Sequence, residues 1–395
     1  MRLITGAVQN YPWGSRSALP QLLQASPTGE PWAEYWLGAH PLGPASLADG
    51  SEQTLADLVE SRPEVVGAAS VERFGPQLPY LFKLLSANQP LSLQAHPTRE
   101  QAAIGFAREE AAGIPLEAPE RTYKDSWPKP ELLVALTPFE ALAGFRCPRR
   151  SAELFAQLPV KSSLDSIISP LTERSGPAAL AEVFLDVLSL GADRRHLVEE
   201  IVAAAVPLMP SEGELGVFAR TAVELDEHFP GDPSIVAALL LNRVHLQPGQ
   251  ALFASAGTMH AYLRGTAVEV MANSDNVLRG GLTKKHIDVD GLITVVNFAE
   301  EDIRPITLEG SDGLYRYPTP APEFELWVAE PTSADPLTLP LSERGRILFV
   351  HKGEHQVTRG EQSLGVSQGQ SVFLEAGETV SVRGSGRLFL VGPGV

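Results

Sequence analysis

The chain has 395 residues, enough for two or three domains that each bury a hydrophobic core. Its 31 basic and 48 acidic residues give a net charge of −17, which argues against non-specific binding to nucleic acid or anionic lipid. The single cysteine, Cys147, excludes an internal disulfide and a cysteine-based zinc site. Because the sequence has no secretory leader and no apolar run of membrane-spanning length, we expect a cytoplasmic protein.

The first part of the chain is expected to consist mainly of short strands and turns. Apolar or alternating runs bounded by turn residues are typical of strands, and 3–4 residue periodicity is typical of helices. Two helices are predicted, over 53–60 and 99–112. Strands are predicted over 33–38, 80–85, 91–96, 131–136 and 139–145.

The spacing of apolar residues in the sequence changes after about residue 149. Up to about residue 227, apolar residues recur at helical spacing, as in LAEVFLDVLSL, and from about residue 235 strands and Gly-rich turns return. A helical domain over 149–234 therefore interrupts a β domain built from residues 1–148 and 235–305. Residues 306–395 are predicted to form a second β domain.

A short internal repeat supports two related β domains. Residues 248–257 read PGQALFASAG and residues 368–377 read QGQSVFLEAG, so a turn, a strand and a second turn recur at the same spacing. His260 follows the first copy at the place where Val380 follows the second. If one of the two β domains binds a metal ion, the first one does, and the C-terminal one is degenerate.

Four residues combine into a candidate metal site. Gln94 and His96 would share one face of a strand, Glu131 leads into an apolar strand, and His260 follows a Gly-rich turn. Each has an ordinary alternative, as a hydrogen-bonded core residue or a solvated side chain at a strand end. Together, two imidazoles, a carboxylate and an amide oxygen suit zinc or another first-row divalent ion.

Seven longer motifs carry a resemblance to a known family. The chain resembles the type I mannose-6-phosphate isomerases (phosphomannose isomerases), which are zinc enzymes of the cupin fold. The most specific motif is NSDNVLRGGLT within residues 260–288. The motifs are YPWGS (11–15), AEYWLGAHPLGPAS (33–46), LPYLFKLLSANQPLSLQAHP (78–97), KPELLVAL (129–136), EALAGFR (140–146), FPGDPSIVAALLLN (229–242) and HAYLRGTAVEVMANSDNVLRGGLTKKHID (260–288).

The resemblance implies a fold, a cofactor and a reaction. The expected fold is mainly β, with two cupin-like (jelly-roll) barrels and an inserted helical domain. One divalent ion, Zn²⁺, is expected on Gln94, His96, Glu131 and His260, which fall on the family's metal positions. The implied reaction interconverts mannose 6-phosphate and fructose 6-phosphate through an enediol(ate).

This chemistry needs further groups beside the metal. Arg279 is a candidate for a charged contact to the reacting oxygens or the phosphate, because its guanidinium matches both; the alternative is a structural ion pair with Asp275. Lys129 and Glu269 are candidates for proton transfer, each against a structural ion pair. No P-loop motif is present. The predicted phosphate-binding residues are Ser92, Lys129, Arg279 and Lys285.

The sequence departs from the family pattern at Trp127-Pro128, where the family usually has Asn-His before the KPE triplet. No role of that histidine can operate here. The departure favours a non-catalytic sugar-phosphate-binding protein as one alternative. A metal-dependent oxygenase is another, although a fourth protein ligand would occupy a position that oxygen needs. We expect a small-molecule sugar phosphate as partner, no nucleic acid or membrane, and a monomer or weak homo-oligomer.

Overall fold

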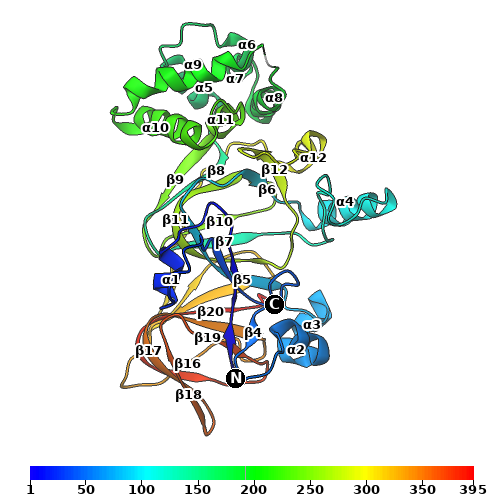
Figure 1. Cartoon of the computed structure of the whole chain (residues 1–395), viewed down its shortest axis with the longest axis vertical. Helices are drawn as coiled ribbons and strands as arrows, with labels where there is room; N and C mark the ends of the chain where they lie inside the picture. Colours follow the sequence, from blue (N-terminus) through cyan, green and yellow to red (C-terminus); the bar gives the residue numbers. More distant parts are fainter. Residues whose placement is uncertain (192) are drawn as a thin grey trace.

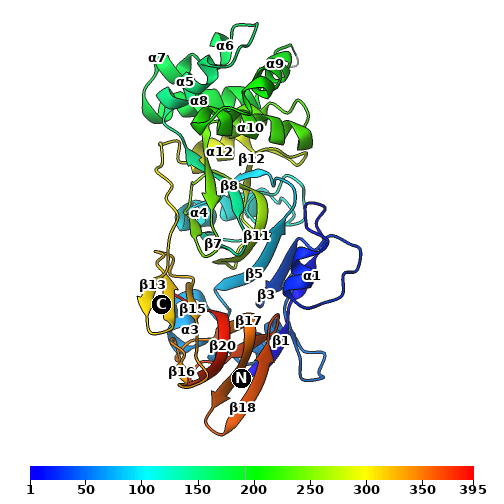
Figure 2. The ribbon, with the colours of Figure 1, turned by 90° about the vertical axis from the view of Figure 1, so that its left-hand side faces the viewer.

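The computed structural model describes residues 1–191 and 193–395. Figure 1 shows three tiers along the longest axis: a block of helices at one end, a β-rich middle part and a second β-rich part that contains both chain termini. In the side view of Figure 2, the segment after α12 (Val289–Val295) runs down the outside of the middle part to β13 (Glu309–Ser311). The mainly β fold with a helical insertion is confirmed.

The middle part is built around one long strand. Strand β11 (His260–Ala272) pairs with β6 and β8 in its first half and with β5 and β7 in its second half. All these pairings are antiparallel, and ten strands form this sheet. They are β2 (Ala7–Gln9), β3 (Glu34–Leu37), β5 (Tyr80–Ala87), β6 (Leu93–Ala95), β7 (Glu131–Ala135), β8 (Phe139–Phe145), β9 (Leu241–Leu246), β10 (Ala251–Ala254), β11 and β12 (Leu278–Gly281).

The second sheet also has ten strands, and it includes the start of the chain. Strand β1 pairs with β19 and with β4, so β1 and β4 lie in the C-terminal sheet, although residues 1–148 were predicted to belong to the first β domain. The members are β1 (Arg2–Thr5), β4 (Ser46–Leu47), β13, β14 (Leu314–Tyr317), β15 (Glu325–Ala329), β16 (Leu337–Thr338), β17 (Arg346–Arg359), β18 (Gln362–Ser367), β19 (Ser371–Leu374) and β20 (Ser381–Gly392).

The repeated sequence adopts the same local structure twice. Strands β10 and β19 each follow a glycine with positive φ, +89° at Gly249 and +88° at Gly369, a conformation that favours glycine in a tight turn. A long strand follows each copy, β11 in one sheet and β20 in the other. His260 and Val380 are both fully buried at the positions that the repeat makes equivalent. This correspondence supports the predicted duplication.

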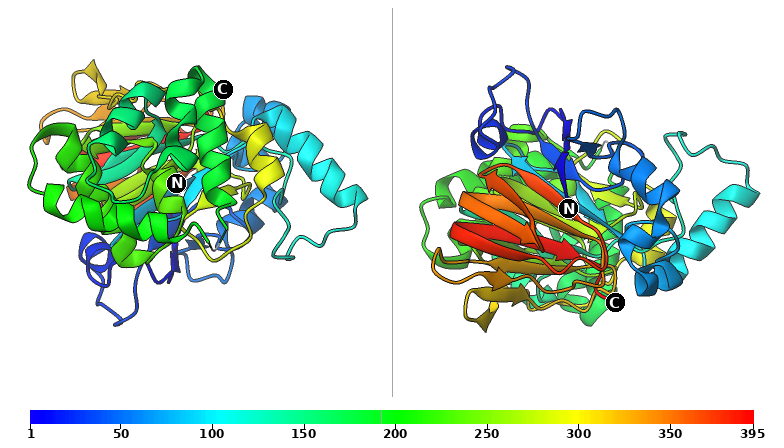
Figure 3. Two further views of the ribbon diagram at one scale, coloured as in Figure 1. Left: turned by 90° about the horizontal axis from the view of Figure 1, so that it is seen from above. Right: turned by 90° about the horizontal axis from the view of Figure 1, so that it is seen from below.

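The inserted helices pack on the end of the middle part, as the view from above in Figure 3 shows. They bury one apolar core that continues into Leu93, Met259 and Leu278 of the β region. The block extends further than predicted, because residues 234–238 form a helix and strands resume only at Leu241. The helices are α5 (Pro148–Ala156), α6 (Asp165–Ile168), α7 (Pro170–Glu173), α8 (Gly176–Leu188), α9 (His196–Ala205), α10 (Gly213–His228) and α11 (Ser234–Ala238).

Further helices lie in the β-rich parts. The predicted helices over 53–60 and 99–112 are present as α2 (Leu55–Ser61) and α4 (Arg99–Ala111), and each begins with a threonine in a capping box. Within the described residues, no helix is both long and apolar enough to cross a membrane. The others are α1 (Ala18–Leu22), α3 (Ala68–Phe74) and α12.

A buried histidine makes the stability of the second β part depend on pH. The ring of His351 packs 5.7 Å from that of Phe389, and burial, with the nearby charges of Lys352 and Arg387, lowers its pKa to about 4. The unfolded chain takes up this proton near pH 6.5, so the free energy of unfolding falls as the pH falls from 6.5 to 4, by about 2–3 kcal/mol. We expect His351→Phe to remove this part of the pH dependence.

Urea unfolding of both proteins at pH 7 and pH 4.5 measures the effect. Wild type and variant should differ in how much stability each loses between the two pH values. An equal loss in both proteins would show that His351 does not titrate in this window.

Candidate metal centre

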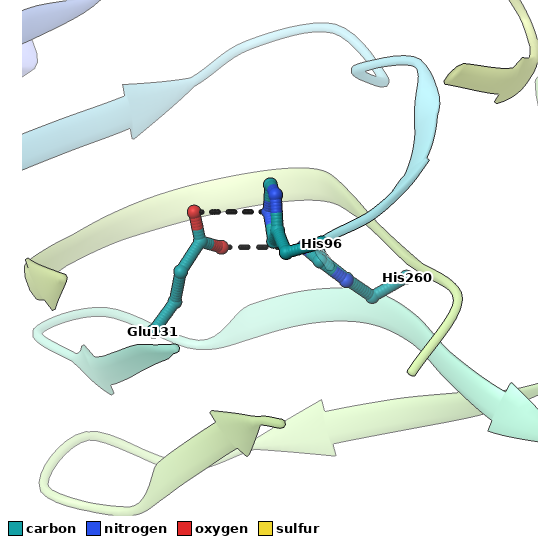
Figure 4. Close-up of side chains that lie close together, drawn as sticks. All are labelled: His96, Glu131 and His260. Atoms are coloured by element: carbon teal, nitrogen blue, oxygen red, sulfur yellow. Dashed lines mark hydrogen bonds and ion pairs between the residues drawn. The ribbon is translucent and has the colours of Figure 1, made fainter. Parts of the chain in front are cut away.

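Three side chains from three separate strands meet in the interior of the middle part. His96 directly follows β6, Glu131 is the first residue of β7 and His260 is the first residue of β11. Their exposed fractions are 0%, 2% and 0%. One donor atom of each lies within 4.8 Å of the others, and Figure 4 shows both imidazoles facing the carboxylate.

Backbone carbonyls orient both imidazoles. Nδ1 of His96 donates to the carbonyl of Asn276 at 2.7 Å, and Nδ1 of His260 donates to the carbonyl of Thr258 at 3.0 Å. The two Nε2 atoms therefore carry lone pairs, and each lies 3.2 Å from an oxygen of Glu131. Imidazoles that ligate metals are commonly held in this way by their second nitrogen.

The site fits a divalent cation better than it fits a hydrogen-bonded core cluster. Nε2 of His96 is buried and has no hydrogen-bond partner among the described residues, since its contact with Glu131 lacks hydrogen-bond geometry. A buried acceptor nitrogen beside a buried carboxylate is costly unless a cation lies between them. Two imidazole nitrogens and a carboxylate are a common zinc set.

The protonation states agree with metal ligation. Burial lowers the pKa of His96 to about 4, so the imidazole is neutral near pH 7. Burial alone would raise the pKa of Glu131, but the ammonium of Lys129, 3.1 Å away, outweighs it and holds this pKa well below its usual range. Neutral imidazole and ionised carboxylate are the forms that bind metal ions.

Gln94 lies on the same face as this cluster. In the antiparallel ladder it is directly opposite His260 on one side and Arg279 on the other, and residues opposite each other project to the same face. Its side chain is half-buried. Its role as fourth ligand remains a prediction that this register supports.

A second buried cluster adjoins the metal centre and was missed by sequence reasoning. Nζ of Lys83 lies 3.3 Å from Glu269 and 3.6 Å from Glu34, and all three side chains are buried. Burial alone would lower the pKa of Lys83, but the two carboxylates outweigh it and raise this pKa. A lysine inside the apolar run LPYLFKLL was the available signal, because a buried cation requires a carboxylate partner.

Tyr262 joins the two clusters. Its hydroxyl donates to Glu269 at 2.8 Å and lies 3.4 Å from Glu131. Burial and these carboxylates raise the pKa of Tyr262 well above its usual range, so the hydroxyl stays protonated. Glu269 is thus held by an ion pair and a hydrogen bond, the structural alternative to its predicted role as a base.

We expect Tyr262→Phe to lower the free energy of unfolding by about 1–3 kcal/mol, because a buried carboxylate loses its donor. Zinc content should not change. The matched control is Tyr35→Phe, which removes another buried hydroxyl, one that accepts from the backbone of Gly6 at 2.6 Å. Urea unfolding and metal analysis of both variants check this. Wild-type stability of Tyr262→Phe would contradict the bridging role.

Arg279 is not in the ion pair with Asp275 that was its structural alternative. Asp275 lies 3.3 Å from Nε2 of His40, and no ion pair or side-chain hydrogen bond of Arg279 is found within the described part of the chain. The guanidinium is half-buried, and burial lowers its pKa. An arginine that is partly desolvated without a carboxylate partner is suited to an anionic ligand.

The other predicted substrate-binding residues differ in how close they lie to Arg279 and the metal centre. Burial and the nearby charge of Arg279 lower the pKa of Lys285, so these two cations share one region, although Lys285 itself is exposed. Lys129 contacts Glu131 at the metal centre. Ser92 is half-buried just before β6, with no recorded side-chain hydrogen bond among the described residues. The roles of all four remain predictions.

Fold and site together define a mainly β protein with a buried His-Glu-His metal centre. A sequence profile described as "Phosphomannose isomerase type I, catalytic domain" matches residues 1–148. Mannose-6-phosphate isomerase of Escherichia coli K12 is 38% identical, with 98% of each chain covered. The human protein of that name is 31% identical over 95% of this chain and 94% of its own. The chain belongs to the type I phosphomannose isomerase family.

Solved structures give the same result. A mannose 6-phosphate isomerase crystallised with zinc and yttrium superposes with a TM-score of 0.89 at 35% identity, covering all of both chains. The apo form of the Salmonella typhimurium enzyme gives the same TM-score and identity over 100% of this chain and 99% of its own. The similarity therefore extends over the β-rich parts and the helical insertion alike.

Proposed function

We propose that this protein is a metal-dependent mannose-6-phosphate isomerase that interconverts mannose 6-phosphate and fructose 6-phosphate through an enediol(ate). The observation that carries the proposal is the buried centre of His96, Glu131 and His260, with Arg279 on the adjoining strand and without an ion-pair partner among the described residues. Family membership over nearly the whole chain supports the same reaction.

Zn²⁺ is the proposed cofactor, held by His96, Glu131 and His260 with Gln94 as the fourth ligand. Bound there, zinc supplies a Lewis acid for the oxygens on the reacting carbons. Arg279 is assigned to the negative charge of the substrate, because it is partly desolvated and has no protein partner in the described residues. Lys285 and Ser92 are assigned to the phosphate group as weaker contacts.

The proton that moves between C1 and C2 needs a group at the metal centre. Of the two predicted candidates, Lys129 lies 3.1 Å from Glu131, whereas both oxygens of Glu269 are engaged by Lys83 and Tyr262. We therefore assign proton transfer to Lys129. Glu269 is assigned a structural role, as the ion-pair and hydrogen-bond partner of Lys83 and Tyr262.

Turnover by the zinc-loaded protein tests this function. Mannose 6-phosphate is the substrate, and fructose 6-phosphate is detected through a coupled assay. Production that depends on added zinc supports the isomerase. Binding of mannose 6-phosphate without turnover would instead support the sugar-phosphate-binding alternative, and oxygen uptake would support the oxygenase.

We propose that the Trp127-Pro128 departure leaves the chemistry of the metal centre unchanged. The ring of Trp127 is stacked by the guanidinium of Arg99, 3.6 Å from its centroid, and lies 5.9 Å from the ring of Phe74. Its side chain is thus engaged in packing. We expect the double variant Trp127→Asn, Pro128→His to change kcat by less than about threefold. A residue acting in proton transfer would instead contribute a rate factor of about 10²–10⁴.

Steady-state kinetics of the double variant and of Trp127→Phe check this expectation. The Phe variant keeps an aromatic ring for Arg99 and controls for lost packing. A gain of tenfold or more in kcat on restoring the histidine would mean that this chain lacks a catalytic group.

The organisation of the chain is proposed on the same basis. The metal-binding catalytic domain comprises residues 1–148 and 235–305, the helical domain residues 149–234 and the degenerate β domain residues 306–395, with β1 and β4 contributed to the last of these. A cupin barrel for each β domain, a cytoplasmic location and a monomer or weak homo-oligomer complete the proposal.

A further inference from the structure

Two loops interlock beside the metal centre. One, residues 124–127, leads towards β7, and the other, residues 273–276, connects β11 to β12. Asn276 lies where they meet and is fully buried. Its surroundings show what this asparagine does, beyond its place in a motif that identified the family.

The side-chain amide of Asn276 is used completely. Its Oδ1 accepts from the backbone N–H of Lys124 at 2.7 Å. Its Nδ2 donates to the carbonyl oxygens of Asp125 at 2.8 Å and Trp127 at 2.9 Å. Asparagine offers an acceptor and two donors on one rigid plane, and no other uncharged side chain of this length does so.

The 124–127 loop binds the 273–276 loop in turn through the side chain of Asp125. Its carboxylate accepts from the hydroxyl of Ser274 at 2.9 Å, from the backbone N–H of Asp275 at 3.0 Å and from that of Trp127 at 2.8 Å. Each loop is therefore held by a side chain of the other. Buried polar networks with every member satisfied make a local structure rigid.

The same asparagine also touches a metal ligand. The backbone carbonyl of Asn276 accepts from Nδ1 of His96 at 2.7 Å. Three residues further along the chain lies Arg279, and the first loop continues to Lys129 and Glu131. The two loops with their mutual hydrogen bonds form an interlock, and each loop directly precedes a segment that carries proposed catalytic groups.

We infer that Asn276 is a positioning residue for the metal centre, an inference that rests on the proposed zinc site. By fixing the two loops, its amide holds its own carbonyl where His96 must donate from Nδ1, and this directs Nε2 at Glu131. Trp127 contributes only backbone atoms to the interlock, which explains why another side chain can stand at this position.

Asn276→Ala is the direct test, with zinc affinity measured by competition against a chelator. Partners that orient a ligand typically contribute 10–100-fold to metal affinity, and we expect a loss in this range. The visible absorption spectrum of the Co²⁺-substituted protein should change as well, since the imidazole is no longer held in one orientation. Both readouts are independent of turnover.

Asn242→Ala is the matched control. Nδ2 of Asn242 also donates to backbone carbonyls, those of Gly144 at 3.1 Å, Glu301 at 3.0 Å and Ala143 at 3.4 Å, but among the described residues Asn242 has no hydrogen bond to a metal ligand. In the absence of metal, both variants should have a lower melting temperature than the wild-type protein. Only Asn276→Ala should weaken zinc binding and alter the Co²⁺ spectrum.

If Asn276→Ala does not fold, Ser274→Ala provides a milder variant, because it removes one hydroxyl from the interlock and leaves the asparagine in place. It should weaken zinc binding in the same direction. Wild-type zinc affinity and Co²⁺ spectrum in the folded variant would overturn the inference. Failure of the wild-type protein itself to bind zinc would instead overturn the proposed function.

Discussion

We expect His260→Ala to lose zinc and activity together. The imidazole supplies one of the three donor atoms that meet within 4.8 Å, and His96 and Glu131 supply the other two. A bound zinc contributes several kcal/mol of charge stabilisation, so turnover should fall by about 10³ or more. Metal analysis after dialysis and the coupled assay measure both losses.

His228→Ala is the control for this variant, because His228 is exposed at the end of α10 and has no recorded contact with the centre. It should keep wild-type zinc content and turnover. Retention of one zinc per chain in His260→Ala, with activity unchanged, would show that His260 is not a metal ligand.

Arg279→Ala should have the opposite pattern, with zinc retained and turnover lowered by about 10²–10³, the usual cost of removing one preorganised electrostatic contact. The reason is the position of Arg279 opposite Gln94 on the metal-bearing face, where no carboxylate of the described part of the chain pairs with it. Arg279→Lys should recover only part of the loss, because lysine keeps the charge but not the planar fork.

Steady-state kinetics with zinc analysis on the same samples separate the two variants from His260→Ala. Arg264→Ala, an exposed arginine on β11, controls for the loss of one positive charge from a chain that is already acidic. An Arg279→Ala enzyme with wild-type kcat/KM would remove Arg279 from the mechanism, and one that loses its zinc would make Arg279 a structural support of the centre.

Local patterns in the sequence predicted most of the strands around the site. The strand predicted over 139–145 is observed with the same bounds, because an apolar run follows the Thr137-Pro138 turn. Helix α11 was missed, since all five of its residues are buried and a segment that is apolar on every side has no helical periodicity. The pairing of β1 with β19 was missed because partners as distant as Arg2 and Phe373 leave no local signal.

The candidate metal ligands could be named from residue type and motif, but their convergence could not. It depends on β6, β7 and β11 being neighbours, which is a property of the strand order. The ion pairs of Lys83 were missed for the same reason, since Glu34 and Glu269 come from β3 and β11 on either side of β5. The backbone carbonyls that orient the imidazoles have no sequence signature of their own.

Anomalous scattering at the zinc edge from a crystal of the zinc-loaded protein tests the central claim most directly. We expect one peak in the middle β part, about 2.0–2.2 Å from Nε2 of His96, Nε2 of His260 and an oxygen of Glu131. A peak bound elsewhere, or none between these three side chains at full zinc loading, would contradict the account.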